Sequence, residues 1–227
     1  MSSLNKKFVM AVTGMFLMAF VMAHLLGNLQ IFLGPEWMNG YAEHLQELPL
    51  LLWPARVFLL LTLCVHMTTG IVLAVQNRAA RPVRYAKSAT LQASPASRTM
   101  VFSGLAIFFF VVFHLLHFTF GQIQPEIFPL VDAKGRHDVY SMVILGFRDP
   151  WIVSCYLLAM FFLTAHLSHG ASSFLQSLGL LSESALPKAK KAGWGLAILV
   201  FIGYTSIPLA VLLGWLSPLQ EGLPLGS

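Results

Sequence analysis

Long apolar runs, separated by short polar stretches, dominate the hydropathy pattern of this chain. About 20 consecutive apolar residues are enough to cross a bilayer as a helix. Five runs reach that length and hold almost no charged residue, with Arg56 near the start of the second as the exception. They lie at roughly 8–33, 53–77, 99–121, 151–176 and 193–216. The pattern predicts an all-α integral membrane bundle of five transmembrane helices, formed as a single domain over residues 1–227.

Composition agrees with this class, because 57% of the residues are hydrophobic, only 10% are charged, and the mean hydropathy is +0.74. Soluble domains carry about 25% charged residues. The two cysteines, Cys64 and Cys155, lie far apart in apolar runs. They exclude a disulfide framework, and also an iron–sulfur cluster held by this chain alone, which needs about four thiolates. The first run is too long for a signal peptide, so we interpret it as a retained helix.

The polar stretches between the runs differ in charge. The stretch 78–98 is basic, 34–52 is acidic and could hold a short interfacial helix, and 122–150 is the longest. With the N-terminus inside, ten of the 14 Lys and Arg residues but one of the nine acids lie on the inner side. Because basic residues favour the cytoplasmic side, we expect a cytoplasmic N-terminus and a C-terminus outside. The net charge of +5 then reflects topology and not a nucleic-acid surface.

Six of the eight histidines fall inside the predicted spans, where an ionisable group is costly and is a candidate for function. They are His24, His66, His114, His117, His166 and His169. One buried histidine can simply bridge two helices. Six in one small bundle indicate iron, zinc or a proton path.

A weak internal repeat divides these histidines into four and two. TGMFLMAFVMAHLLG, from Thr13, aligns with SGLAIFFFVVFHLLH, from Ser103, and HMTTG, from His66, aligns with HLSHG, from His166. The aligned positions are His24 with His114 and His66 with His166. At 1.5 Å per residue, the first pair lies about 25 Å from the inner helix ends and the second about 15–18 Å. Two such pairs, each bridging two helices, suit two haems with two axial imidazoles apiece.

Other sites fit the pattern less well. A catalytic zinc needs three protein ligands at one point, a c-type haem needs CxxCH, and a proton-coupled transporter favours carboxylates, which the spans lack. Gly27, Gly70 and Gly170 lie about one turn from histidines, where a porphyrin would approach the backbone. Close helix packing explains each of these glycines equally well.

Four segments, KKFVMAVTGMFLMAFVMAHLLGNLQIF, HLLHFTFG, DVYSMVILGFRDPW and AHLSHGASSFLQSLGL, carry a family resemblance. From residue 3 to residue 216 the chain resembles the cytochrome b membrane-anchor subunit of bacterial succinate dehydrogenase/fumarate reductase, of the five-helix, two-haem type. The resemblance implies electron transfer between a membrane quinone, usually menaquinone, and an iron–sulfur subunit and FAD flavoprotein on the cytoplasmic side of the inner membrane. It covers both succinate oxidation and fumarate reduction, and the dicarboxylate site would lie outside this chain.

Carried over, the family's ligands to the iron of two b haems are the aligned pairs, His24 with His114 and His66 with His166. His117 and His169 would then line the haem pockets, and a rival hypothesis makes one of them an axial ligand.

The family also places an acid of the quinone site between the first two helices. Glu43, with His44 beside it, is the nearest candidate, although both could be solvated loop residues. Thr164 stands where some two-haem fumarate reductases carry a glutamate for proton movement. Two other functions stay open: a cytochrome b anchor of a hydrogenase or formate dehydrogenase, and a haem-free transporter or scaffold.

Overall fold

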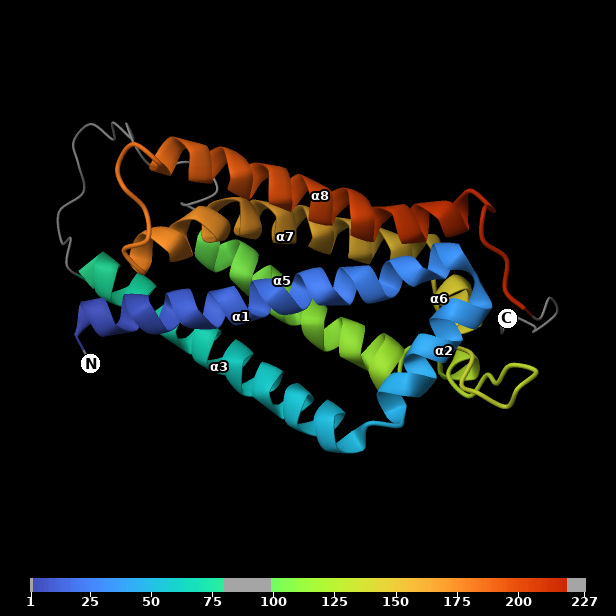
Figure 1. Ribbon diagram of the computed structural model, residues 1–227. Coiled ribbons are helices and arrows are strands. Elements are labelled where there is room, and N and C mark those ends of the chain that lie inside the picture. The colour runs from blue at the N-terminus through green and yellow to red at the C-terminus, as the bar shows by residue number, and fades with distance from the viewer. Residues whose placement is uncertain (1, 80–98, 220–227) are drawn as a thin grey trace. The chain divides into compact units, whose positions relative to one another are not determined.

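The computed structural model describes residues 2–79 and 99–219. Five helices in this part of the chain are long and apolar enough to cross a membrane (Figure 1). They are α1 (Ser3–Leu29, extended by η1, Gln30–Leu33), α3 (Pro49–Ala79), α5 (Met100–His114, extended by η2, Leu115–Thr119), α7 (Pro150–Ser177) and α8 (Leu186–Leu212). The predicted five helices are confirmed, and they suggest a multi-pass membrane protein.

Several helix boundaries differ from the prediction, and α1 and α3 begin at Ser3 and Pro49 and not at 8 and 53. Helix α8 begins at Leu186 and not at 193, because the Lys and Ala residues after Pro187 form a helix although they are too polar for a hydropathy signal. The third span is α-helical only to His114 and continues as the π-helical turn η2. Most of the basic stretch 78–98 lies outside the described residues.

Two shorter helices lie between the long ones. Helix α2 (Pro35–Gln46) occupies the acidic stretch, with Pro35 in its first turn and the carboxylate of Glu36 near its positive end. Helix α6 (Val139–Gly146) was not predicted. Its N-terminus is capped by Asp138, whose carboxylate accepts the backbone N–H of Ser141 at 3.0 Å. Helices α2 and α6 contact each other, and the short turn η3 (Pro125–Ile127) also contacts α6 (Figure 1).

The chain divides into two compact units. Unit 1 comprises Met1–Met22, Pro54–Ile107 and Phe162–Leu199, and unit 2 comprises Ala23–Trp53, Phe108–Phe161 and Val200–Ser227. The single domain over residues 1–227 stays a prediction.

Unit 1 has few large buried side chains. Its buried residues are mostly small, among them Ala11, Ser103, Ala171 and Ala197, and small residues let membrane helices approach closely. Large apolar side chains such as Phe102, which is 63% exposed, lie on the outside of the helices. Such a surface is suited to lipid and not to water.

Unit 2 contains a larger apolar core, built around α6. Ile144 of α6 is fully buried, and it belongs to one cluster with Ile31, Val153 and Tyr156. Within α6, the seven residues from Tyr140 to Gly146 are buried, and Val139 is partly buried. A helix that is apolar all round is expected to be buried in this way.

Candidate functional site

The first histidine pair lies in unit 1. The rings of His66 in α3 and His166 in α7 have their centroids 6.3 Å apart and their planes at 67°. Both side chains are half-buried. The pair joins two helices that are far apart in the sequence.

Each ring of this pair lies within hydrogen-bond distance of a hydroxyl from another helix, α1 for His66 and α5 for His166. The Nδ1 atom of His66 lies 3.0 Å from Thr13 Oγ1, and that of His166 lies 3.2 Å from Ser103 Oγ. The next residue is a glycine in both cases. A Cβ at Gly14 would lie 3.2 Å from Cε1 of His66, and one at Gly104 3.4 Å from Cε1 of His166. The Thr-Gly and Ser-Gly segments of the repeat therefore contact the two histidine rings in the same way.

The hydroxyl hydrogens fix which nitrogen of each ring carries a proton. Thr13 gives its hydrogen to the carbonyl of Val9 at 2.7 Å, and Ser103 gives its hydrogen to the carbonyl of Met100 at 3.1 Å. A hydroxyl has one hydrogen, so toward Nδ1 it can only accept. With the two hydroxyls donating to these carbonyls, neutral His66 and His166 carry their proton on Nδ1, and the lone pair of each ring lies on Nε2, the nitrogen available to a metal.

The second pair lies in unit 2. The rings of His24 in α1 and His114 in α5 have centroids 5.8 Å apart and planes at 79°. Both are half-buried. Tyr204 of α8 lies with its ring centroid 6.2 Å from that of His24, and Nδ1 of His114 lies 3.2 Å from the hydroxyl of Tyr156.

Both separations fit a metal held between two imidazoles. An imidazole nitrogen binds a metal at about 2 Å and lies about 1.1 Å from its ring centroid, so two rings on one ion have centroids about 6 Å apart. The observed values are 6.3 and 5.8 Å. Among residues 2–79 and 99–219, no three His, Cys, Asp or Glu side chains converge as a metal-binding group.

The two remaining histidines of the spans lie one turn from a paired histidine. His117 is 1% exposed, and both of its ring nitrogens have protein partners: Nδ1 lies 3.0 Å from the Tyr156 hydroxyl and Nε2 lies 2.8 Å from Gln124 Oε1. His169 is half-buried in α7, and its carbonyl accepts the Ser172 hydroxyl at 3.2 Å.

Of the three glycines proposed for haem pockets, two have protein side chains as close neighbours and one has none. A Cβ at Gly27 would lie 2.9 Å from the ring of Tyr41, one at Gly70 would lie 2.8 Å from the methyl group of Met10, and one at Gly170 would meet nothing within 4 Å. Their role at a haem stays a prediction.

A polar pocket of about 330 Å³ in unit 2 contains the predicted acid Glu43. Arg136 and His137 also line it, whereas His44 is exposed and is not part of the lining. The Nε2 atom of His137 lies 2.8 Å from the carbonyl of Phe128, so it is the donor, and Nδ1 is the acceptor of the neutral ring.

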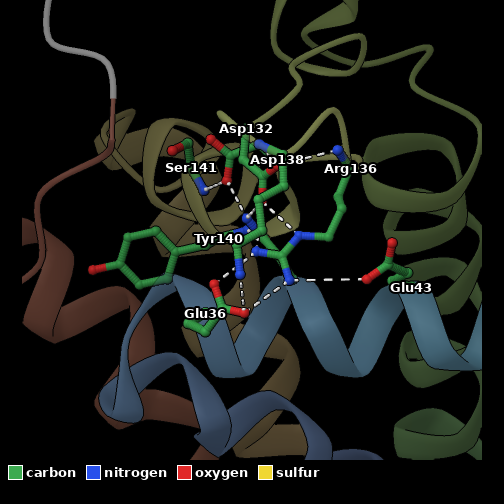
Figure 2. Close-up of polar contacts among 9 residues, drawn as sticks. Glu36, Glu43, Asp132, Arg136, Asp138, Tyr140 and Ser141 are labelled. Atoms are coloured by element: carbon green, nitrogen blue, oxygen red, sulfur yellow. Dashed lines mark hydrogen bonds and ion pairs between the residues drawn. The ribbon is translucent and has the colours of Figure 1, made fainter.

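Arg136 connects α2 to the segment before α6. Figure 2 shows its guanidinium among three carboxylates, and it donates to Asp132 at 2.8 Å and to Glu36 at 3.0 Å, with Glu43 at 3.8 Å. The hydrogen bonds to Glu36 and Asp132 raise the pKa of Arg136. The pKa of Glu36 is lowered by the hydrogen bonds that its carboxylate accepts, of which that from Lys134 has the largest effect and that from Arg136 the next.

Asp132 is the buried acid of this group. Burial alone would raise the pKa of Asp132, but the hydrogen bonds from Arg136, the Lys134 backbone and Asn39 outweigh it and lower the pKa to about 2. Asn39, fully buried, also donates to Asp138 at 3.0 Å and accepts the backbone N–H of Tyr140 at 2.9 Å.

Comparison with known proteins gives no relative from which a function could be taken: no family model, no curated protein and no solved structure matches the chain.

Several contacts of the site were missed by sequence reasoning. Tyr156, Gln124, Arg136 and His137 follow no spacing rule, and only Thr13 and Ser103 gave a signal, through the internal repeat.

Proposed function

We propose that the chain is the two-haem cytochrome b anchor of a succinate:quinone oxidoreductase, which carries electrons between a membrane quinone and an iron–sulfur subunit. The observation that carries this proposal is the presence of one histidine pair in each unit, with ring separations of 6.3 and 5.8 Å. His66 with His166 would hold the iron of one haem, and His24 with His114 would hold the iron of the other.

The chain's own residues would bind, orient and insulate the haems. When bound, each haem supplies one-electron transfer. The Nε2 atoms of His66 and His166 face away from the hydroxyls that hold Nδ1, and such an outer partner fixes ring orientation and raises the basicity of a ligand. The apolar helices around the pairs keep water out and so keep the reduction potentials under the control of the protein.

The remaining parts of the proposal come from the family resemblance. The partners would be an iron–sulfur subunit and a FAD flavoprotein on the cytoplasmic side of a bacterial inner membrane, with the N-terminus on that side. The chain would be an electron-transfer subunit of the enzyme, and the dicarboxylate would react elsewhere in the complex. Menaquinone is the expected quinone.

The pocket at Glu43 is the candidate quinone site. The Glu43 carboxylate is 46% exposed and could accept a hydrogen bond from a quinol hydroxyl. His137, on the same pocket, offers its Nδ1 as a second acceptor. Exchange of Glu43 for Gln removes the negative charge, and it should raise the KM for quinol while both haems are retained.

Haem content tests the proposal directly. The dithionite-reduced minus oxidised spectrum of the purified chain should show b-type haem, and pyridine haemochrome should give two haems per polypeptide. One haem would remove one pair from the ligand assignment. No haem in a folded preparation would overturn the proposal and leave the histidines as bridges of a transporter or scaffold. Copurified hydrogenase or formate dehydrogenase subunits would place the anchor in another complex.

A further inference from the structure

Tyr156 has its hydroxyl in a strongly apolar part of unit 2. The residue is 8% exposed, and the rings of four phenylalanines surround it with centroid distances between 4.8 and 6.0 Å. They are Phe110, Phe113, Phe118 and Phe147. A buried phenol needs a hydrogen-bond partner in such surroundings, because an unpaired polar group there is costly.

The partners of this hydroxyl are two histidines. Nδ1 of His114 lies 3.2 Å from the phenol oxygen, and Nδ1 of His117 lies 3.0 Å from it. Nε2 of His117 in turn lies 2.8 Å from Oε1 of Gln124. Four side chains from α5, η2, α7 and the segment after η2 thus form one continuous chain of hydrogen bonds.

The direction of every bond in the chain follows from the available hydrogens. Gln124 Oε1 only accepts, so Nε2 of His117 donates, and the neutral His117 ring then accepts at Nδ1. Tyr156 therefore gives its single hydrogen to His117. Its oxygen is left to accept the Nδ1 hydrogen of His114, and the lone pair of His114 lies on Nε2. A neutral His117 ring is the reasonable state because the ring is 1% exposed.

We propose that Tyr156, His117 and Gln124 are positioning residues that hold His114 in its Nδ1-protonated form and lower the reduction potential of the iron that His114 binds. The inference rests on the proposed function, since it concerns one of the two haems. A ligand histidine that donates its other N–H becomes a stronger base, and a stronger base favours oxidised iron. Each further bond along the chain polarises the one before it.

Two backbone features support this role. Gln124 has φ 55° and ψ 59°, and it is the non-glycine residue with positive φ in the described part of the chain. Left-handed backbone costs an ordinary residue about 1–2 kcal/mol, so the surrounding structure must hold Gln124 there. The π-helical turn η2, which contains His117, is a feature that occurs often at functional sites.

The hydrogen bonds of the other histidine pair are shorter in extent among the described residues. His66 and His166 each lie next to one aliphatic hydroxyl, which in turn donates to a carbonyl of its own helix. The two haems should therefore respond to different substitutions. Tyr156→Phe should affect only the haem of His114, and Ser103→Ala should affect only the haem of His166.

The experiment is a redox titration of both haems in the purified full chain, followed by optical and EPR spectra. In Tyr156→Phe we expect two haems, an upward shift in the midpoint potential of one of them, and an unchanged potential for the other. Gln124→Met should shift the same haem in the same direction by less. Tyr140→Phe exchanges a buried tyrosine of the same apolar cluster for which no hydrogen bond to a histidine is found among the described residues, so it is the matched control and should leave both potentials unchanged.

Two unchanged potentials in Tyr156→Phe with both haems present would overturn the inference and leave the proposed function intact. If Tyr156→Phe lost haem or failed to fold, Gln124→Met would decide, and an unchanged potential there would overturn the inference. A wild-type chain without haem would overturn the proposed function first. In that case ¹⁵N NMR of labelled histidine in the full chain still tests the bond directions, and a proton on Nδ1 of His117 would contradict them.

Discussion

Single hydrogen atoms decide the chemistry of the paired histidines. Thr13 and Ser103 have already given theirs to helix carbonyls, so the hydroxyls can hold a ring only by accepting from it. Threonine and serine are interchangeable in this respect, which explains why the repeat tolerates either. A valine or alanine at the same position would keep the helix and lose the orientation of the ring.

Exchange of His114 and His117 for Ala separates the two hypotheses for the third span. His114→Ala should reduce the haem content from two per chain to one, because its Nε2 is the nitrogen left for iron. His117→Ala should keep two haems, because both of its ring nitrogens bond to protein groups. Pyridine haemochrome of the purified variants measures this. The opposite result would make His117 the ligand.

Gly14→Val should displace the ring of His66. A Cβ at Gly14 would lie 3.2 Å from Cε1 of His66, and the two methyl groups of valine leave no space for the ring. We expect loss of about one haem per chain, the same one that His66→Ala removes, with the helix itself retained. Haem content and the difference spectrum are the measurements. Gly195→Val is the matched control, because nothing lies within 4 Å of a Cβ there. An equal loss of haem in both variants would refute a specific packing of the His66 ring against Gly14.

At the scale of elements, the contact between α2 and α6 depends on ions and amides as well as on apolar packing. Arg136 donates to the carboxylate of Asp132, and Asn39 donates to the carboxylates of Asp132 and Asp138. A buried amide or carboxylate that loses its partner costs about 1–3 kcal/mol. The group therefore fixes the position of α2, and with it the wall of the Glu43 pocket.

Acid should weaken this contact within a defined pH range. The pKa of Asp132 is lowered from 3.8 to about 2 in the folded chain, so its contribution to stability is complete above about pH 4 and is lost as the pH falls toward 2. Thermal unfolding of the detergent-solubilised protein between pH 5 and pH 2 should show this decline. Asp132→Asn should be less stable at pH 5 and should show a smaller decline. Glu183→Gln, at an exposed carboxylate, is the control. An unaltered decline in Asp132→Asn would refute the role of this carboxylate.

Hydropathy predicted the elements that exceed about 20 apolar residues, and the acidic stretch 34–52 holds the short helix that we expected there, whereas α6 was missed. VYSMVILG, which forms α6, is apolar but has only eight residues, and it follows a stretch rich in Pro and Asp. The capping residue Asp138 was a usable signal. The partners of Arg136 were beyond prediction, because they depend on how α2 meets a distant loop.

At the scale of the whole molecule, the histidines that the internal repeat aligns fall in the same unit. Each unit contains one histidine pair, and both pairs join residues that the repeat aligns. Apolar periodicity and the repeat were enough to predict which histidines face each other. They could not predict Tyr156 or Gln124, since an aromatic residue in an apolar span and an amide in a loop carry no pattern of their own.

Reporter fusions test the predicted orientation of the whole chain. Alkaline phosphatase fused after Ser227 should be active in bacterial cells, because five spans with a cytoplasmic N-terminus place the C-terminus outside. The control is a fusion after Ser182, between α7 and α8, which should be inactive. High activity of the second fusion and none of the first would reverse the topology.

The π-helical turn η2 also makes the structure sensitive to the number of residues between His114 and Gln124. A π-helical turn contains one residue more than an α-helical turn, so loss of a single residue from Leu115–Thr119 would restore the α-helical pitch. Everything after the deletion would then rotate by about 100° around the helix axis. His114 would keep its place while Gln124 pointed elsewhere. A deletion of one amino acid would therefore separate His114 from Gln124, and we expect small insertions and deletions in this turn to be selected against more strongly than substitutions.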